Sequence, residues 1–180
     1  MRRLIAVLVL PPAVTLLLCS AGCKRKPQKV EVQATEEEAQ ELESMVHVAD
    51  PRASLQLVRG FHDVEQNAWR WTMAKFSVTL RPPAGGAQNG ATLTLNLAVP
   101  DPVIQRLKSI SLRANVQGVP LEAETYFKPG SYTYTKDVPA RALSGDAVTV
   151  DFWLDKWLPP GAVDQRELGV VVSSVGFEAK

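Results

Sequence analysis

Alternation of apolar and polar residues runs through this chain from residue 53 to its end. Successive side chains of a β-strand point to opposite faces, so this pattern is typical of strands with one buried face and one wet face. In residues 92–99, for example, every second side chain is Leu or Val. Similar runs, separated by turns rich in Pro, Gly and Asn, occupy residues 54–58, 75–80, 110–116, 121–127, 131–137, 148–154 and 169–177.

About eight short strands with almost no helix predict an all-β domain in which two antiparallel sheets pack as a sandwich. The strand number favours a jelly roll, and an immunoglobulin-like sandwich is the alternative. One helical turn is expected over residues 101–107, because Pro102 lies just inside its start.

The first 22 residues have the pattern of a secretory signal. Arg2 and Arg3 precede an apolar stretch from Leu4 to Leu18. A membrane-spanning helix needs about 20 apolar residues, and this stretch is shorter. Pro11-Pro12 would also interrupt a spanning helix. The sequence therefore predicts a signal peptide over residues 1–22.

Cys23 follows the small residues Ser20-Ala21-Gly22 directly. This arrangement resembles the lipobox of bacterial lipoproteins, although Leu is usual where Ser20 stands. The resemblance implies that Cys23 carries a diacylglycerol and holds the exported chain on membrane lipid in the bacterial cell envelope. Lys24, rather than Asp, follows the cysteine, which in enteric lipoproteins favours the outer over the inner membrane. A plain signal peptide cut near Ala21 is the alternative.

Residues 23–52 are highly charged, with basic residues beside Cys23 and acidic residues after them. We interpret this segment as a stalk, either a short helix or a chain without regular structure, that carries a domain of residues 53–180. The whole chain has 20 Lys and Arg against 19 Asp and Glu. This balance gives no electrostatic reason to expect a nucleic-acid partner.

Two stretches of the domain share a further resemblance. Residues 60–65 lead through 69–72 into one strand, and residues 164–169 lead into the strand at 170–177. Together they resemble a group of uncharacterised bacterial β-sandwich domains, found as small lipoproteins or beside glycosyltransferases of surface-polysaccharide synthesis. The resemblance implies a jelly-roll-like fold similar to galactose-binding domains. It supplies no catalytic residues.

Residues suited to catalysis are few. His47 lies in the expected stalk, and His62 is expected in a loop after the first strand. The sequence contains no Gly-x-Ser-x-Gly elbow and no zinc-ligand spacing of histidines. We therefore expect no catalytic residue, metal or cofactor. Paired carboxylates can hydrolyse glycosidic bonds, which leaves a weak glycoside hydrolase as an alternative, using carboxylates drawn from Glu65, Asp151, Asp155, Asp164 and Glu167.

The chain has four tryptophans, and sugar rings stack on exposed indole faces. Trp69 and Trp71 fall on the same side of an extended segment. Trp153 should face away from the core, because its neighbours Phe152 and Leu154 continue the apolar series. The alternative is that the tryptophans are covered or fill the ends of the sandwich. The candidate ligand-binding residues are Trp153 and Trp157 first, with Asp151, Asp155, Trp69 and Trp71.

These features predict a non-enzymatic envelope lipoprotein. Its sandwich would be an accessory module that binds a glycan or a protein. The expected partners are membrane lipid through acylated Cys23, and surface polysaccharide or envelope proteins. A purely structural protein–protein module is a further alternative to the weak hydrolase.

Overall fold

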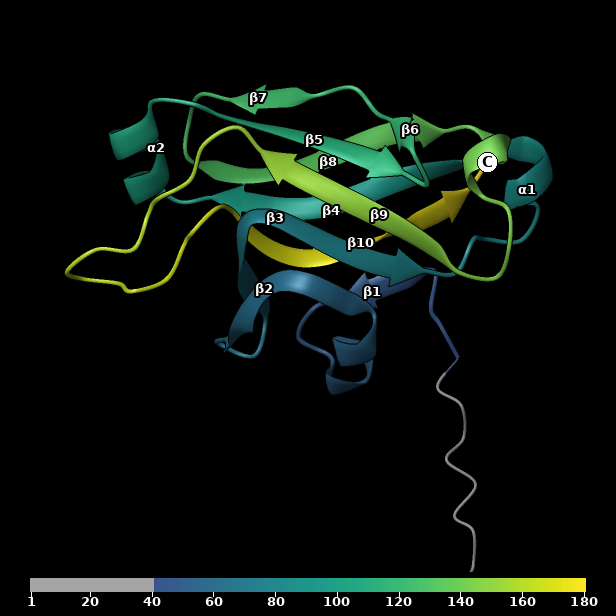
Figure 1. The fold of residues 1–180 in the computed structure, drawn as a ribbon, viewed down its shortest axis with the longest axis horizontal. Helices are drawn as coiled ribbons and strands as arrows, with labels where there is room; N and C mark the ends of the chain where they lie inside the picture. The colour runs from purple at the N-terminus through teal and green to yellow at the C-terminus, as the bar shows by residue number, and fades with distance from the viewer. Residues whose placement is uncertain (1–40) are drawn as a thin grey trace, which may run out of the picture. The chain divides into compact units, whose positions relative to one another are not determined.

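A computed structural model describes residues 41–180 (Figure 1). The predicted signal peptide, Cys23 and most of the predicted stalk lie outside the described residues. The strands are β1 (Met45–His47), β2 (Leu57–Glu65), β3 (Trp69–Leu80), β4 (Ala91–Val99), β5 (Ile110–Val116), β6 (Val119–Pro120), β7 (Glu124–Tyr126), β8 (Gly130–Val138), β9 (Val148–Leu154) and β10 (Val171–Ala179). Two short α-helices, α1 (Gly86–Asn89) and α2 (Asp101–Leu107), and two 3-10 helices, η1 (Pro51–Leu55) and η2 (Ala140–Ala142), connect them.

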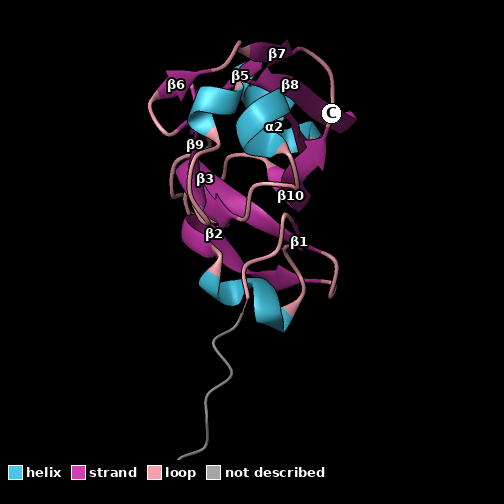
Figure 2. Cartoon of the chain, turned by 90° about the vertical axis from the view of Figure 1, so that its right-hand side faces the viewer, coloured by secondary structure: helices cyan, strands magenta, loops and turns pink. Residues whose placement is uncertain are grey.

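All strand pairs are antiparallel, in the order β6-β5-β9-β3-β10-β4-β8, with β2 beside β3, β7 beside β5 and β1 beside β10. The sheet curls into a sandwich. One layer, which we call the front layer, contains β5, β9 and β3, and Figure 1 shows it in front of the back layer, which contains β8, β4 and β10. Figure 2 shows the same strands from the end at which α1 and the C-terminus lie. The predicted all-β antiparallel sandwich is therefore confirmed.

The long strand β3 joins the two layers. Its second half pairs with β9 from Lys75 to Leu80, whereas Arg70 and Trp71 pair with β10. At the division between these partners, Thr72 donates its backbone N–H to the Val170 carbonyl at 2.8 Å. A single strand can belong to both layers because the sheet bends where its partner changes.

The core lies between the layers and is filled by the apolar half of each alternating strand. Leu93, Leu95 and Val99 of β4 are fully or almost fully buried, as are Val148 and Val150 of β9. The side chains between them in sequence are less buried, as alternation predicts. Burial of such residues contributes about 25 cal/mol per Å² of apolar surface, and this term favours one register of the strands.

The two ends of the strand order, β8 on one side and β5 with β6 and β7 on the other, approach each other as the sheet curls. The hydroxyl of buried Tyr134 in β8 donates to the Glu122 carbonyl at 2.8 Å. Lys136 of β8 forms a 3.3 Å salt bridge with Glu124 of β7. These contacts hold β8 against the segment that runs from β6 to β7.

The sandwich begins earlier than the predicted boundary at residue 53. Strand β1 pairs with β10, and Val46 and Val48 are completely buried. The side chain of Gln56 fixes the segment before β1, since its amide nitrogen donates to the Glu43 carbonyl at 3.0 Å. The helix considered for the stalk is therefore wrong at Met45–His47, where the residues form a strand.

The helical segments are short. The turn expected at residues 101–107 is confirmed as α2. Of the strand expected at 54–58, residues 54 and 55 lie in η1 and residues 57 and 58 begin β2. Within residues 41–180, no helix has the length and apolar character needed to cross a membrane.

Candidate functional site

Trp153 lies on the outer face of the front layer, as alternation predicts. In β9 it stands directly between Lys75 of β3 and Arg113 of β5. The guanidinium carbon of Arg113 lies 5.6 Å from the centroid of the indole ring, within the range of a cation–π contact. The indole is half-buried. A hollow of about 260 Å³ opens beside it.

The two carboxylates that flank Trp153 in sequence each accept a hydrogen bond from another strand. Asp151 accepts a hydrogen bond from Arg59 at 2.8 Å. Asp155 accepts the backbone N–H of Ser111 at 2.6 Å. These donors from β2 and β5, which sequence reasoning did not place there, hold the two carboxylates in position. A carboxylate has about four acceptor positions, so the role of Asp151 and Asp155 as acceptors for a ligand stays a prediction.

Trp157 lies in the loop that follows β9. Its side chain is 40% exposed. The next residue, Leu158, forms an isolated bridge with Leu168 that closes this loop. Among the described residues, Trp157 makes no ring contact with Trp153. A shared stacking surface of these two residues stays a prediction.

Trp69 and Trp71 lie on the same side of β3, as expected. Their ring centroids are 6.4 Å apart and the rings meet edge to face at 82°. Trp69 borders a groove of about 370 Å³ over the back layer. Ligand pockets commonly fall between about 300 and 1,000 Å³, so the groove is large enough for a small ligand. It is lined by Trp69, Asn96, Leu97, Ala98, Ser131, Tyr132, Thr133, Val171 and Ser173.

The polar groups of this groove belong to three neighbouring strands. Asn96 of β4 stands opposite Thr133 of β8 and Ser174 of β10. Its side-chain carbonyl accepts from the Thr133 hydroxyl at 2.9 Å, and its amide donates to the Ser174 hydroxyl at 2.9 Å. These bonds hold the amide in place. The lining contains no charged residue.

Sequence reasoning found Trp69 and Trp71 but missed the polar residues beside them. The available signal was the run of hydroxyl and amide side chains on the wet faces of residues 92–96 and 131–135. Alternation assigns these side chains to outer faces, but it does not show that β4 pairs with β8. The groove therefore became visible only with the strand order.

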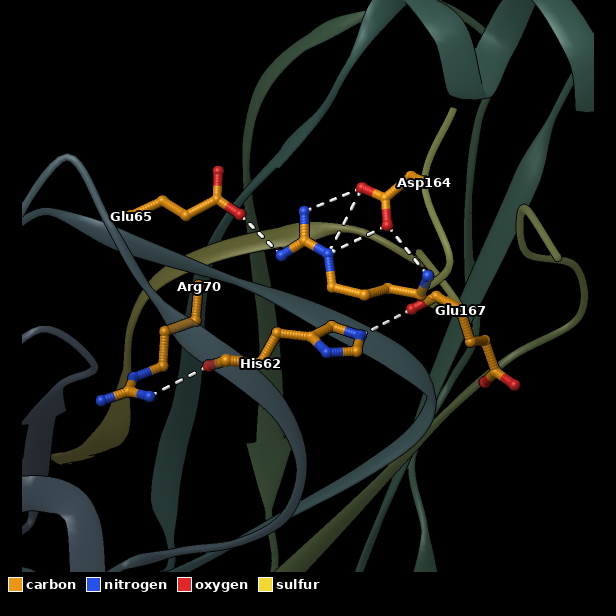
Figure 3. A network of polar contacts seen from close by, with 6 residues as sticks. His62, Glu65, Arg70, Asp164 and Glu167 are labelled. Carbon is orange, nitrogen blue, oxygen red and sulfur yellow. Dashed lines mark hydrogen bonds and ion pairs between the residues drawn. The ribbon is translucent and has the colours of Figure 1, made fainter. Parts of the chain in front are cut away.

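Arg166 is the centre of a charged network that fixes the loop before β10, and Figure 3 labels its partners Glu65 and Asp164. It contacts Asp164 at 2.9 Å and Glu65 at 2.7 Å. His62 lies in β2, not in a loop as expected, and its Nε2 bonds the Glu167 carbonyl at 2.7 Å. The Glu167 carboxylate accepts the backbone N–H of Ala74 at 2.6 Å. The network attaches the loop to β2 and β3.

The hydrogen bonds from Arg166 lower the pKa of Asp164 from 3.8 to about 2. Its folded-state pKa is thus below its unfolded-state value. Between about pH 4 and pH 2 the unfolded chain binds more protons at this carboxyl than the folded chain does. The stability that Asp164 contributes is therefore lost as the pH falls through that range. An acid with so low a pKa remains ionised near neutrality and cannot serve as a general acid.

Asp164→Asn should therefore lower the melting temperature near neutral pH, and the difference from the unmodified protein should disappear between about pH 4 and pH 2. Thermal unfolding followed by circular dichroism measures both. Asp146→Asn, which changes an exposed carboxylate in another loop, is the control and should leave the melting temperature unchanged. A constant difference for Asp164→Asn across this pH range would contradict the assigned role of the carboxylate.

Within residues 41–180, no three His, Cys, Asp or Glu side chains gather closely enough to hold a metal ion. The carboxylates considered for hydrolysis accept hydrogen bonds from the chain itself at Asp151, Asp155, Asp164, Glu65 and Glu167. Their arrangement serves the packing of strands and loops.

No protein-family model and no curated protein matches the chain. Among solved structures, it is similar to the CBM36-1 domain of a multidomain xylanase from the hindgut metagenome of Trinervitermes trinervoides, at 10% identity and a TM-score of 0.36. That match covers 68% of this chain and 87% of the domain. A CBM4 structure is 13% identical, with a TM-score of 0.30, over 74% of this chain and 81% of that one. At these values neither match supports an argument about a ligand.

Proposed function

We propose that the sandwich is a non-catalytic module that binds a neutral glycan in the Trp69 groove. The observation that carries this proposal is the composition of the groove, which combines an indole, a held amide and several hydroxyls with no charge. Small-ligand sites are typically concave, largely apolar and supplied with a few placed polar groups.

Each part of the groove suits one part of a sugar. The indole of Trp69 offers an apolar face to the C–H groups of a pyranose ring. The amide of Asn96 and the hydroxyls of Ser131 and Thr133 offer donors and acceptors to sugar hydroxyls. Because Asn96 is already held by two hydrogen bonds, little side-chain entropy is lost when a ligand binds.

Trp69→Ala should weaken binding of a neutral oligosaccharide by about 1–3 kcal/mol, by analogy with aromatic stacking on nucleobases, which corresponds to about 5- to 150-fold in Kd. A glycan array selects the oligosaccharide, and isothermal titration calorimetry measures the Kd. Trp157→Ala is the control, since it removes a part-exposed indole outside the groove. Equal affinity of the Trp69→Ala variant and the unmodified protein would refute the proposal.

We also propose that acylated Cys23 anchors this module on membrane lipid of the bacterial cell envelope, in the outer rather than the inner membrane. The support is the resemblance of residues 16–23 to a lipobox. A single acyl chain anchors weakly, whereas two or three together make the attachment stable.

Cys23→Ser should leave an unprocessed precursor or release the protein from membranes. Fractionation of cells and labelling with a radioactive or clickable fatty acid measure the two effects. The opposite result, full membrane association without label in the Cys23→Ser variant, would show that another feature holds the protein there.

A further inference from the structure

Within the part of the chain that the structure describes, the outer face of the front layer carries two cations that form no salt bridge. Lys75 and Arg113 flank Trp153 from the two neighbouring strands. Both side chains are exposed. Among residues 41–180, neither forms a salt bridge, and the contact of Arg113 with the indole is its one side-chain interaction. We call Lys75, Trp153 and Arg113 the cationic row.

The carboxylates near this row do not neutralise it. Asp151, two residues before Trp153 in β9, forms a salt bridge with Arg59 of β2 at 2.8 Å. Asp155 lies 4.0 Å from Lys156 and accepts the Ser111 amide. Since these acids are paired elsewhere, the positive charge of Lys75 and Arg113 is available to a ligand.

A hollow beside the row gives a ligand somewhere to lie. It measures about 260 Å³ and is bordered by Trp153, Arg113, Ser111, Asp155 and Ala123, with the core residues Leu112 and Leu154 at its base. Ala123 belongs to the segment before β7, so this segment borders the hollow together with β5 and β9. It therefore presents an indole, a cation and a hydroxyl together.

We propose that the cationic row binds an acidic saccharide, with a uronate ring against Trp153 and its carboxylate on Arg113 or Lys75. A guanidinium pairs with a carboxylate through two parallel hydrogen bonds. The Ser111 hydroxyl and the Asp155 carboxylate can receive sugar hydroxyls. The Asp155 charge opposes a densely anionic ligand such as a polyphosphate, whereas a uronate has one charge on each ring. The site lies on the opposite outer face from the Trp69 groove and acts independently of it.

The test compares trigalacturonate with its full methyl ester, in which a methyl group removes the charge of each carboxylate. Calorimetry on the purified full chain at low salt should show the acid binding at least about tenfold more tightly than the ester. Arg113→Ala and Lys75→Ala should each weaken binding of the acid about tenfold, and Trp153→Ala should abolish it. Arg113→Lys, which keeps the charge, should retain part of the affinity.

Two controls separate this site from general charge and from the Trp69 groove. Arg141→Ala removes an exposed positive charge on η2 and should leave trigalacturonate binding unchanged. Trp69→Ala should also leave it unchanged, so failure of the neutral-glycan proposal would not affect this result. Equal binding of acid and ester, or an Arg141→Ala loss as large as that of Arg113→Ala, would overturn the inference.

Discussion

Gly176→Val should lower the free energy of unfolding by about 3–6 kcal/mol, because it forces β1 away from the sheet. A Cβ atom on Gly176 would lie 2.6 Å from the Ser44 carbonyl oxygen and 2.7 Å from the Met45 Cα. These are backbone atoms, so the strand itself must move. Release of β1 exposes Val46 and Val48, which are completely buried, and each buried valine contributes about 1.5–3 kcal/mol.

Urea unfolding measures this loss, and hydrogen exchange at the Val48 amide, which bonds the Ser173 carbonyl at 3.0 Å, shows whether β1 is released. Gly161→Ala is the matched control, since its Cβ would meet nothing closer than 4.0 Å. Unchanged stability of Gly176→Val would contradict the inclusion of β1 in the sandwich.

Phe76→Ala should cost about 3–5 kcal/mol of stability, as large-to-small substitutions of buried aromatics do. Phe76 is completely buried. Its ring stacks on Phe152 at 4.8 Å and meets Phe61 edge to face at 5.4 Å. Its removal therefore leaves a cavity between β2, β3 and β9 that the layered core cannot readily close.

Chemical denaturation compares this variant with Phe127→Ala. Phe127 is 69% exposed, so its loss should change stability by no more than about 0.5 kcal/mol. Similar losses for the two variants would contradict the assignment of Phe76 to the core.

The class of fold could be predicted because it depends on local alternation. Residues 92–99 and 148–154 bury one face, and that fact alone gives strands and a core face. The strand β1 was missed because its burial depends on β10, more than a hundred residues later. Only the start of β2 was predicted, within the strand expected at 54–58, because Gly60, with φ +77°, and several irregular pairings interrupt the alternation of the rest.

The candidate site could be predicted only in part, for a related reason. The outward direction of Trp153 follows from the residues on either side of it in β9. The partners of its side chain come from other strands, and pairing places Lys75 and Arg113 beside the indole while Arg59 occupies Asp151. Periodicity gives the face of a residue, but strand order decides its neighbours.

The central claim is that neutral glycan binds beside Trp69, and the indole N–H signals of the protein test it most directly. Each of the four tryptophans gives one such signal in a proton–nitrogen correlation spectrum, and single Trp→Phe variants assign them. Titration with the neutral oligosaccharide should shift the Trp69 signal, and that of its neighbour Trp71, while Trp153 and Trp157 stay in place. Shifts confined to Trp153 and Trp157 would contradict the claim.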